Sequence, residues 1–119
     1  MDLTTLGTYV KNAIKSKLNL FTRVTGLTSL TIDCSTADIF EISLSTNGAL
    51  VVTNVPTNKE KKFIITNSGA SEITITYPNT ADYWESATFK IAAGKKKVTA
   101  LEFNGTTRFW YLSTEMKNA

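Results

Sequence analysis

The chain has 119 residues, of which 42% are hydrophobic and 19% are charged, and its formal net charge is +3. These values predict one folded domain and exclude an intrinsically disordered chain. The only cysteine is Cys34, which excludes an intrachain disulfide and fits a reducing compartment. No apolar run approaches the roughly 20 residues of a membrane helix, so we expect no membrane partner.

The first element is an amphipathic helix, predicted over residues 3–18. Its apolar residues recur at spacings of three and four, which places them on one stripe of a helix. An isolated helix of this length is marginal in water, so the stripe must bury against the body of the same chain or against neighbouring subunits. The candidate interface residues are those of the stripe and two adjoining lysines: Leu3, Leu6, Val10, Lys11, Ile14, Lys15 and Leu18.

We take residues 1–26 as an N-terminal helical arm, in which residues 19–26 connect the helix to a body at residues 27–119. All of the excess positive charge lies in the arm, which carries Lys11, Lys15, Lys17 and Arg23 against Asp2. A basic arm on a balanced body favours contact with something anionic. The alternative is a helix whose lysines are simply solvated.

From residue 27 onward the hydrophobic period changes to two, which predicts β-strands. We expect about eight strands: residues 27–34, 40–45, 50–52, 61–67, 72–77 and 87–91, and two more that flank Asn104-Gly105. Short strands separated by regular turn signals are typical of antiparallel sandwiches and barrels. The predicted fold class is therefore an all-β antiparallel β-sandwich, jelly-roll-like or immunoglobulin-like, preceded by the arm.

Asn104-Gly105 is the strongest turn signal, because this dipeptide accepts positive φ at both central positions of a two-residue hairpin loop. The strands on either side carry the largest apolar side chains of the chain. We therefore predict that this hairpin forms the centre of the core, through Leu101, Phe103, Phe109, Trp110, Tyr111 and Leu112.

The sequence offers little for catalysis. It contains no histidine, which removes the commonest general base and metal ligand. The carboxylate pairs Asp33 with Asp38 and Asp82 with Glu85 remain as candidates for acid–base chemistry or calcium binding, but nothing ties them to a cleft. We expect no enzyme activity, no cofactor and no metal site, and we expect Cys34 to be a small core residue.

Two other features invite a functional interpretation. The lysines at 59–62 and at 95–97 are expected to be solvated residues that keep sheet edges from pairing; a nucleic-acid site is the less favoured alternative. Tyr83 and Trp84, in a predicted loop, are candidate ligand contacts, because such rings stack on sugars or anchor interfaces. The alternative for Trp84 is that it folds back over the end of the body.

Between residues 28 and 113 the chain carries a series of strand and turn motifs: Asn54-Val55-Pro56, Phe63-Ile64-Ile65-Thr66-Asn67-Ser68-Gly69, Ile73-Thr74-Ile75-Thr76-Tyr77-Pro78, Trp84, Gly94-Lys95, Phe103-Asn104-Gly105-Thr106 and Arg108-Phe109-Trp110-Tyr111. Through these motifs the body resembles a small β-sandwich domain of tailed-bacteriophage virion proteins, found in tail fibres and in head decoration proteins. In this chain Glu85-Ser86 follows Trp84, where such domains often carry a glycine pair, so the loop differs from the family pattern.

The resemblance implies a non-enzymatic virion building block, made in the host cytoplasm and located in the virion. A short chain with one arm suits a capsid decoration or auxiliary head subunit, anchored by the arm to the major capsid protein, to other virion proteins or to its own copies. A homo-oligomer is expected, with a trimer favoured. The alternatives are a tail-fibre module that binds a receptor or surface glycan through Tyr83 and Trp84, and a nucleic-acid-binding β-barrel that uses the basic arm.

Overall fold

The structure is a computed structural model that describes residue 7 and residues 22–79, 82–84, 86–113 and 116–117. The helix predicted over residues 3–18 therefore lies outside the described residues, apart from Gly7. The same holds for the candidate interface residues Leu3, Leu6, Val10, Lys11, Ile14, Lys15 and Leu18.

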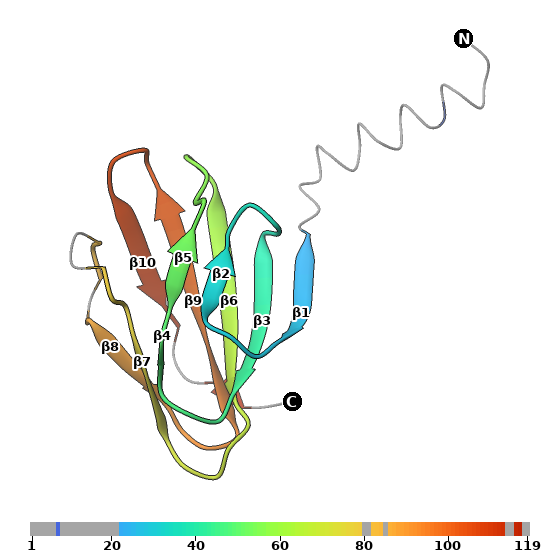
Figure 1. Cartoon of the computed structure of the whole chain (residues 1–119), viewed down its shortest axis with the longest axis vertical. Helices are drawn as coiled ribbons and strands as arrows, with labels where there is room; N and C mark the ends of the chain where they lie inside the picture. The colour runs from blue at the N-terminus through green and yellow to red at the C-terminus, as the bar shows by residue number, and fades with distance from the viewer. Residues whose placement is uncertain (1–6, 8–21, 80–81, 85, 114–115, 118–119) are drawn as a thin grey trace.

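The described body is all-β (Figure 1). Among the described residues, no helix has the length and the apolar character that crossing a membrane requires. The strands are β1 (Arg23–Leu27), β2 (Thr31–Asp33), β3 (Ile39–Leu44), β4 (Gly48–Ala49), β5 (Val51–Thr53), β6 (Glu60–Asn67), β7 (Ile73–Thr76), β8 (Thr88–Ile91), β9 (Lys95–Phe103), β10 (Arg108–Leu112) and β11 (Met116–Lys117).

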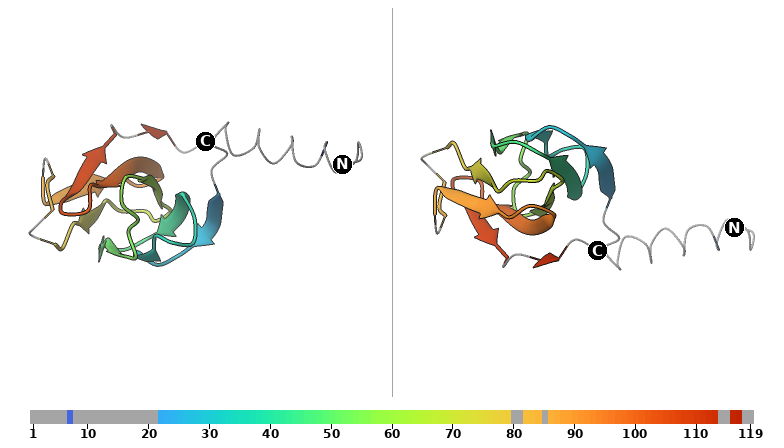
Figure 2. Two further views of the ribbon diagram at one scale, coloured as in Figure 1. Left: turned by 90° about the horizontal axis from the view of Figure 1, so that it is seen from above. Right: turned by 90° about the horizontal axis from the view of Figure 1, so that it is seen from below.

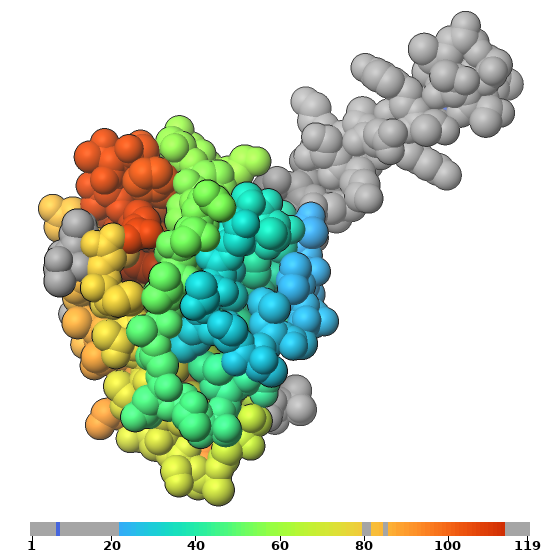
Figure 3. Space-filling model, viewed as in Figure 1, coloured from blue at the N-terminus to red at the C-terminus, as the bar shows by residue number. Residues whose placement is uncertain are grey.

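The strands form one large sheet and two small ones. The large, six-stranded sheet has the order β1-β3-β6-β9-β10, and β11 pairs with β9; the small sheets are β2-β5 and β4-β7-β8. In Figure 1 the small sheets lie in front of the large sheet, and Figure 3 shows, in the same view, the surface that they present. Seen from above and below, the strands surround one interior (Figure 2).

The predicted antiparallel arrangement is wrong for about half of the sheet pairs. β3 pairs in parallel with both β1 and β6, and the pairs β2·β5 and β4·β7 are parallel as well. Between β1 and β3, and again between β3 and β6, the chain passes through strands of the small sheets, and β1, β3 and β6 run in the same direction, whereas β9 runs antiparallel to β6. A parallel pair needs such a crossover, whereas a hairpin would make the pair antiparallel.

The predicted boundary between arm and body also shifts. Residues 23–26, expected to be part of a connector, belong to β1, which pairs with β3 at the edge of the large sheet. Arg23 and Glu41 form an ion pair of 3.1 Å across these two strands. The body of the protein therefore begins by residue 23.

The core lies between the inward faces of the sheets. Phe63 in β6 is fully buried, and its ring contacts Phe40 at 5.3 Å and Trp110 at 5.7 Å between centroids. Trp110 in turn contacts Tyr77 at 4.8 Å, which links the large sheet to the residues that follow β7. The other large, buried apolar residues are Leu30, Ile32, Ile42, Leu50, Ile65, Ile73, Ile75, Phe89, Ile91 and Leu101.

The predicted hairpin is present, with a different loop. Phe103 pairs with Arg108, so the loop spans residues 104–107 and not two residues. Within it only Gly105 has positive φ, at 97°. Asn104 closes the loop instead with its side chain, because its Oδ1 accepts hydrogen bonds from the backbone N–H groups of Thr106 (2.9 Å) and Thr107 (2.7 Å).

Candidate functional site

The outward surface of the large sheet is the most distinctive exposed feature of the body. On β6, Phe63 and Ile65 are buried and Ile64 lies half-exposed between them. On β9, Leu101 is buried, whereas Val98 and Ala100 are half-exposed. We call this surface the outer face and define it by the outward apolar residues Ile64, Val98, Ala100, Phe109 and Tyr111, together with Tyr83.

The outer face corrects the prediction that the whole aromatic run of β10 is core. Trp110 is buried at 7% exposure, but its neighbour Tyr111 is 53% exposed and Leu112 is 39% exposed. Phe109 and Phe103 are half-exposed. Successive side chains of a strand point to opposite faces, so Phe109 and Tyr111 lie on the face opposite to Trp110. That alternation was the signal in the sequence by which the outer face could have been found.

The strand register arranges the outer face in rows. Tyr111 pairs with Ala100, and Ala100 pairs with Lys62 on β6. In the next outward row, Phe109 pairs with Glu102, and Glu102 pairs with Glu60. The aromatic edge along β10 therefore borders Ala100 and Glu102 on β9, with Lys62 and Glu60 beyond them on β6, and Ile64 and Val98 form the following row on β6 and β9.

Tyr83 extends this aromatic edge by one strand position. Its N–H donates to the Arg108 carbonyl and its carbonyl accepts from the Trp110 N–H, both at 2.9 Å, in an isolated parallel bridge to β10. Its ring stacks on Phe109, with centroids 5.5 Å apart and an interplanar angle of 11°. The tyrosine side chain remains 65% exposed, which makes it the most exposed of the large apolar residues that the structure describes.

Asp82 fixes the position of Tyr83. Its side chain is buried, and Oδ1 accepts from Arg108 Nε at 2.9 Å while Oδ2 accepts from Trp110 Nε1 at 2.8 Å. Both carboxylate oxygens are thus used to hold the loop against β10. Glu85, the other member of this candidate carboxylate pair, lies outside the described residues.

Trp84 takes a different position from Tyr83. Its ring packs against the core, stacked on Tyr77 with centroids 6.3 Å apart. This confirms the alternative in which Trp84 folds back over the body. A hollow of about 610 Å³ lies beside the Tyr77 and Trp84 rings, and its other lining residues are Ser86, Trp110, Tyr111 and Leu112. Tyr83 and Trp84 therefore do not form one stacking platform.

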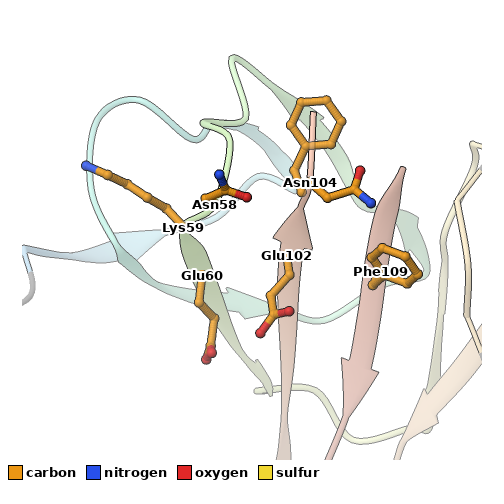
Figure 4. A pocket seen from close by; sticks show the side chains of 7 residues that line it. Asn58, Lys59, Glu60, Glu102, Asn104 and Phe109 are labelled. Carbon is orange, nitrogen blue, oxygen red and sulfur yellow. The ribbon is translucent and has the colours of Figure 1, made fainter. Parts of the chain in front are cut away.

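A second hollow, of about 410 Å³, lies at the acidic end of the outer face (Figure 4). The Glu60 and Glu102 side chains point to the same side, near Phe109, and Lys59 points away from them (Figure 4). Lys62 Nζ lies 3.6 Å from the Glu60 carboxylate, at the surface. Glu102 forms no ion pair with any of the described residues.

The carboxylates Asp33 and Asp38 are structural. Asp33 Oδ1 accepts from the hydroxyl and the N–H of Ser35, hydrogen bonds that hold the pKa of Asp33 below its usual value, with a smaller contribution from Asn54. Asp38 accepts a hydrogen bond from the N–H of Thr22, which is the main reason that its pKa is lowered. The structure therefore does not bring these two carboxylates together as an acid–base pair.

Lys61 corrects the expectation that the lysines at 59–62 are all solvated. Its side chain is only 5% exposed, and Nζ donates to the Ala37 carbonyl at 2.7 Å and to Asp38 Oδ1 at 3.0 Å. Lys59 and Lys62 are exposed. Position 61 shares the inward face of β6 with Phe63, so Lys61 enters the interior and is neutralised by Asp38.

The described residues contain no group of three or more metal-ligating side chains. Cys34 is buried, and this burial raises the pKa of its thiol to about 11, which keeps it protonated and a poor nucleophile. Burial likewise raises the pKa of Tyr77 to about 12, although its hydroxyl is hydrogen-bonded to Thr99 at 2.7 Å. The polar groups of the interior therefore serve the fold.

No protein-family model, curated protein or solved structure matches this chain.

Proposed function

We propose that this chain is a non-enzymatic bacteriophage virion structural protein, a capsid decoration or auxiliary head subunit held in place through its N-terminal arm. The observation that carries the proposal is the outer face, where a rigid β body leaves Tyr83, Phe109 and Tyr111 open to contact. Buried side-chain polar atoms of the described residues all have hydrogen-bond partners, as expected for a body that serves as a building block.

The proposal includes the architecture and the anchor. We interpret the two small sheets as one layer of a mixed β-sandwich and the large sheet as the other. The arm precedes β1, at the edge of the large sheet opposite to β10. Its stripe, which includes Leu6, Val10 and Ile14, supplies the apolar contact with other virion proteins, and Lys11 and Lys15 supply charge.

The test is the composition of virus particles. Particles purified on a density gradient from a lysate of the strain that carries this gene should contain the chain, at a fixed ratio to the major capsid protein by mass spectrometry. The full-length variant Ile14→Asp should be made in the cell but be depleted from particles, because a charge on the stripe opposes its burial. The wild-type chain being abundant in the lysate but absent from particles would contradict the proposal.

A second candidate is a surface-glycan-binding module, such as one found at a tail-fibre tip. The observation that favours it is the Tyr83 ring, which is exposed and held flat against Phe109, an arrangement suited to stacking on a sugar. On a glycan array, Tyr83→Ala should abolish binding, while Ser43→Ala, an exposed change elsewhere on the large sheet, should not. Absence of binding by the wild-type protein would remove this candidate.

The outer face gives no support to the nucleic-acid alternative. The cross-strand pair Glu60 and Glu102 places negative charge at one end of the face, which repels phosphates. Nucleic acid therefore remains an alternative for the basic arm alone.

A further inference from the structure

We propose that the outer face of the large sheet receives residues 3–18 of a second copy of this chain, so that copies are joined by exchanged arms. This inference rests on the proposed function and narrows it, because it names the partner of the arm and the surface that the arm occupies.

The outer face offers apolar contacts to the stripe. Ile64, Val98 and Ala100 lie on the neighbouring strands β6 and β9, beside the exposed Lys62, and Phe109 and Tyr111 lie on β10. Three adjacent strands spaced about 4.8 Å apart place β6 and β10 roughly 10 Å from each other. A 16-residue helix is about 24 Å long, so the stripe is longer than this part of the sheet is wide.

The charges of the two surfaces are complementary. Glu60 and Glu102 are direct cross-strand partners, and like charges in such a position are mutually destabilising. The exposed Lys62, 3.6 Å from the Glu60 carboxylate, offsets one of the two charges. The arm carries Lys11 and Lys15, four residues apart, which on a helix lie about 5–6 Å from each other. Directly opposed residues in a sheet have a similar separation. The spacing of Lys11 and Lys15 on a helix therefore equals the spacing of Glu60 and Glu102 across the two strands.

The way the arm leaves the body favours a neighbouring copy over the same copy. Thr22 is held to the start of β3 by three hydrogen bonds: its N–H donates to Asp38 Oδ2 (2.9 Å), and its carbonyl accepts from the N–H groups of Asp38 (2.8 Å) and Ile39 (3.0 Å). These bonds hold the chain just before β1 begins. Only residues 19–21 separate this fixed point from the predicted helix, and so short a connection limits how the stripe can reach its own sheet.

An exchange of this kind closes readily. Each copy gives one arm and receives one arm, so a ring of two or three copies leaves no outer face and no stripe unoccupied. The contact is heterologous, between two different surfaces of the same chain, and this property makes the proposal testable by mixing two defective variants.

The first experiment measures the self-association of the full-length protein by sedimentation velocity over a concentration series. The wild type should form a discrete oligomer. Ile64→Lys on the outer face and Ile14→Lys on the stripe should each weaken association about 10- to 100-fold, because each buries a charge in an apolar contact. The matched control is Val51→Lys, which alters a 41% exposed apolar residue of β5 in a small sheet and should leave association unchanged.

The second experiment mixes the two defective variants. Ile64→Lys keeps an intact arm and Ile14→Lys keeps an intact outer face, so together they should form a 1:1 complex that neither forms alone. Circular dichroism and thermal melting should show both variants folded. If the contact joined two outer faces, or if each arm folded onto its own sheet, mixing the two variants would give no such complex. Absence of the 1:1 complex would therefore overturn the proposal.

A monomeric wild type over the whole concentration series would also overturn it. That outcome is distinguishable from failure of the proposed function, because incorporation into particles is measured separately. A chain that is present in virions but monomeric in solution would leave the structural role intact and remove the arm exchange.

Discussion

The side chain of Lys61 shows how one residue ties two parts of the body together. Its Nζ bridges the Ala37 carbonyl and Asp38, just before β3, from an inward position on β6. Asp38 in turn holds Thr22, where the arm leaves the body. A buried charge of this kind is retained only when it is paired, so these residues form one structural unit.

We expect Lys61→Met to lower the free energy of unfolding by about 1–3 kcal/mol, because it leaves a carbonyl and a partly exposed carboxylate without their donor. The measurement is urea denaturation followed by tryptophan fluorescence. The adjacent, exposed Lys62 is the matched control, and Lys62→Met should change stability by no more than about 0.5 kcal/mol. Equal effects of the two changes would contradict the buried position of Lys61.

Acid should destabilise the protein partly through Asp38. The hydrogen bond from Thr22 and the ion pair with Lys61 hold the pKa of Asp38 below its unfolded value, which is about 3.9. The resulting stabilisation is complete above the unfolded pKa and is lost as the pH falls through the lower folded pKa.

Urea denaturation at neutral pH and at a series of acidic pH values tests this prediction. Asp38→Asn should be less stable than the wild type at neutral pH and should lose less stability on acidification. Asp33, whose pKa is lowered as well, accounts for part of the dependence that remains. An Asp38→Asn variant with an unchanged acid profile would show that this carboxyl contributes nothing to it.

At the scale of elements, β10 divides its side chains between stability and contact. Trp110 packs on Phe63 and Tyr77 and donates to Asp82, whereas Tyr111 points outward. Adjacent positions on the same strand thus have different tasks, which the alternation of a β-strand makes possible.

Trp110→Ala should therefore lower the free energy of unfolding by roughly 3–5 kcal/mol, through lost burial and the cavity it leaves. Tyr111→Ala should cost less than about 1 kcal/mol, because its side chain is mostly exposed. Thermal or urea unfolding measures both. A fully stable Trp110→Ala protein would show that the aromatic contacts around Phe63 do not hold the core together.

At the scale of the whole molecule, the topology sets the folding rate. β1, β3 and β6 are neighbours in the large sheet, yet strands of the small sheets separate them in the chain. Each pairing must close a loop before it gains any stabilisation, and proteins dominated by such pairings fold in milliseconds to seconds.

Refolding monitored by stopped-flow tryptophan fluorescence should accordingly fall in this slow range. Folding within microseconds would contradict the long-range pairing of β3 with β6.

Much of the interior follows from local pattern. Alternation puts Phe63 and Ile65 on one face of β6, and Ile73 and Ile75 on one face of β7, and the structure buries all four. The same rule placed Cys34 in the core, and it is buried there. Such positions could be predicted because the side-chain period of a strand is a property of neighbouring residues alone.

Local pattern was thus enough to predict an all-β body, the approximate strand positions, the final hairpin and most inward residues. The parallel pairing of β3 with β1 and β6, the burial of Lys61 beside Asp38, and the open face shared by Phe109, Tyr111 and Tyr83 are visible only in the folded molecule. Alternation specifies which side of a strand is apolar, whereas the partner strand and the layer that covers each side depend on contacts between residues far apart in the chain.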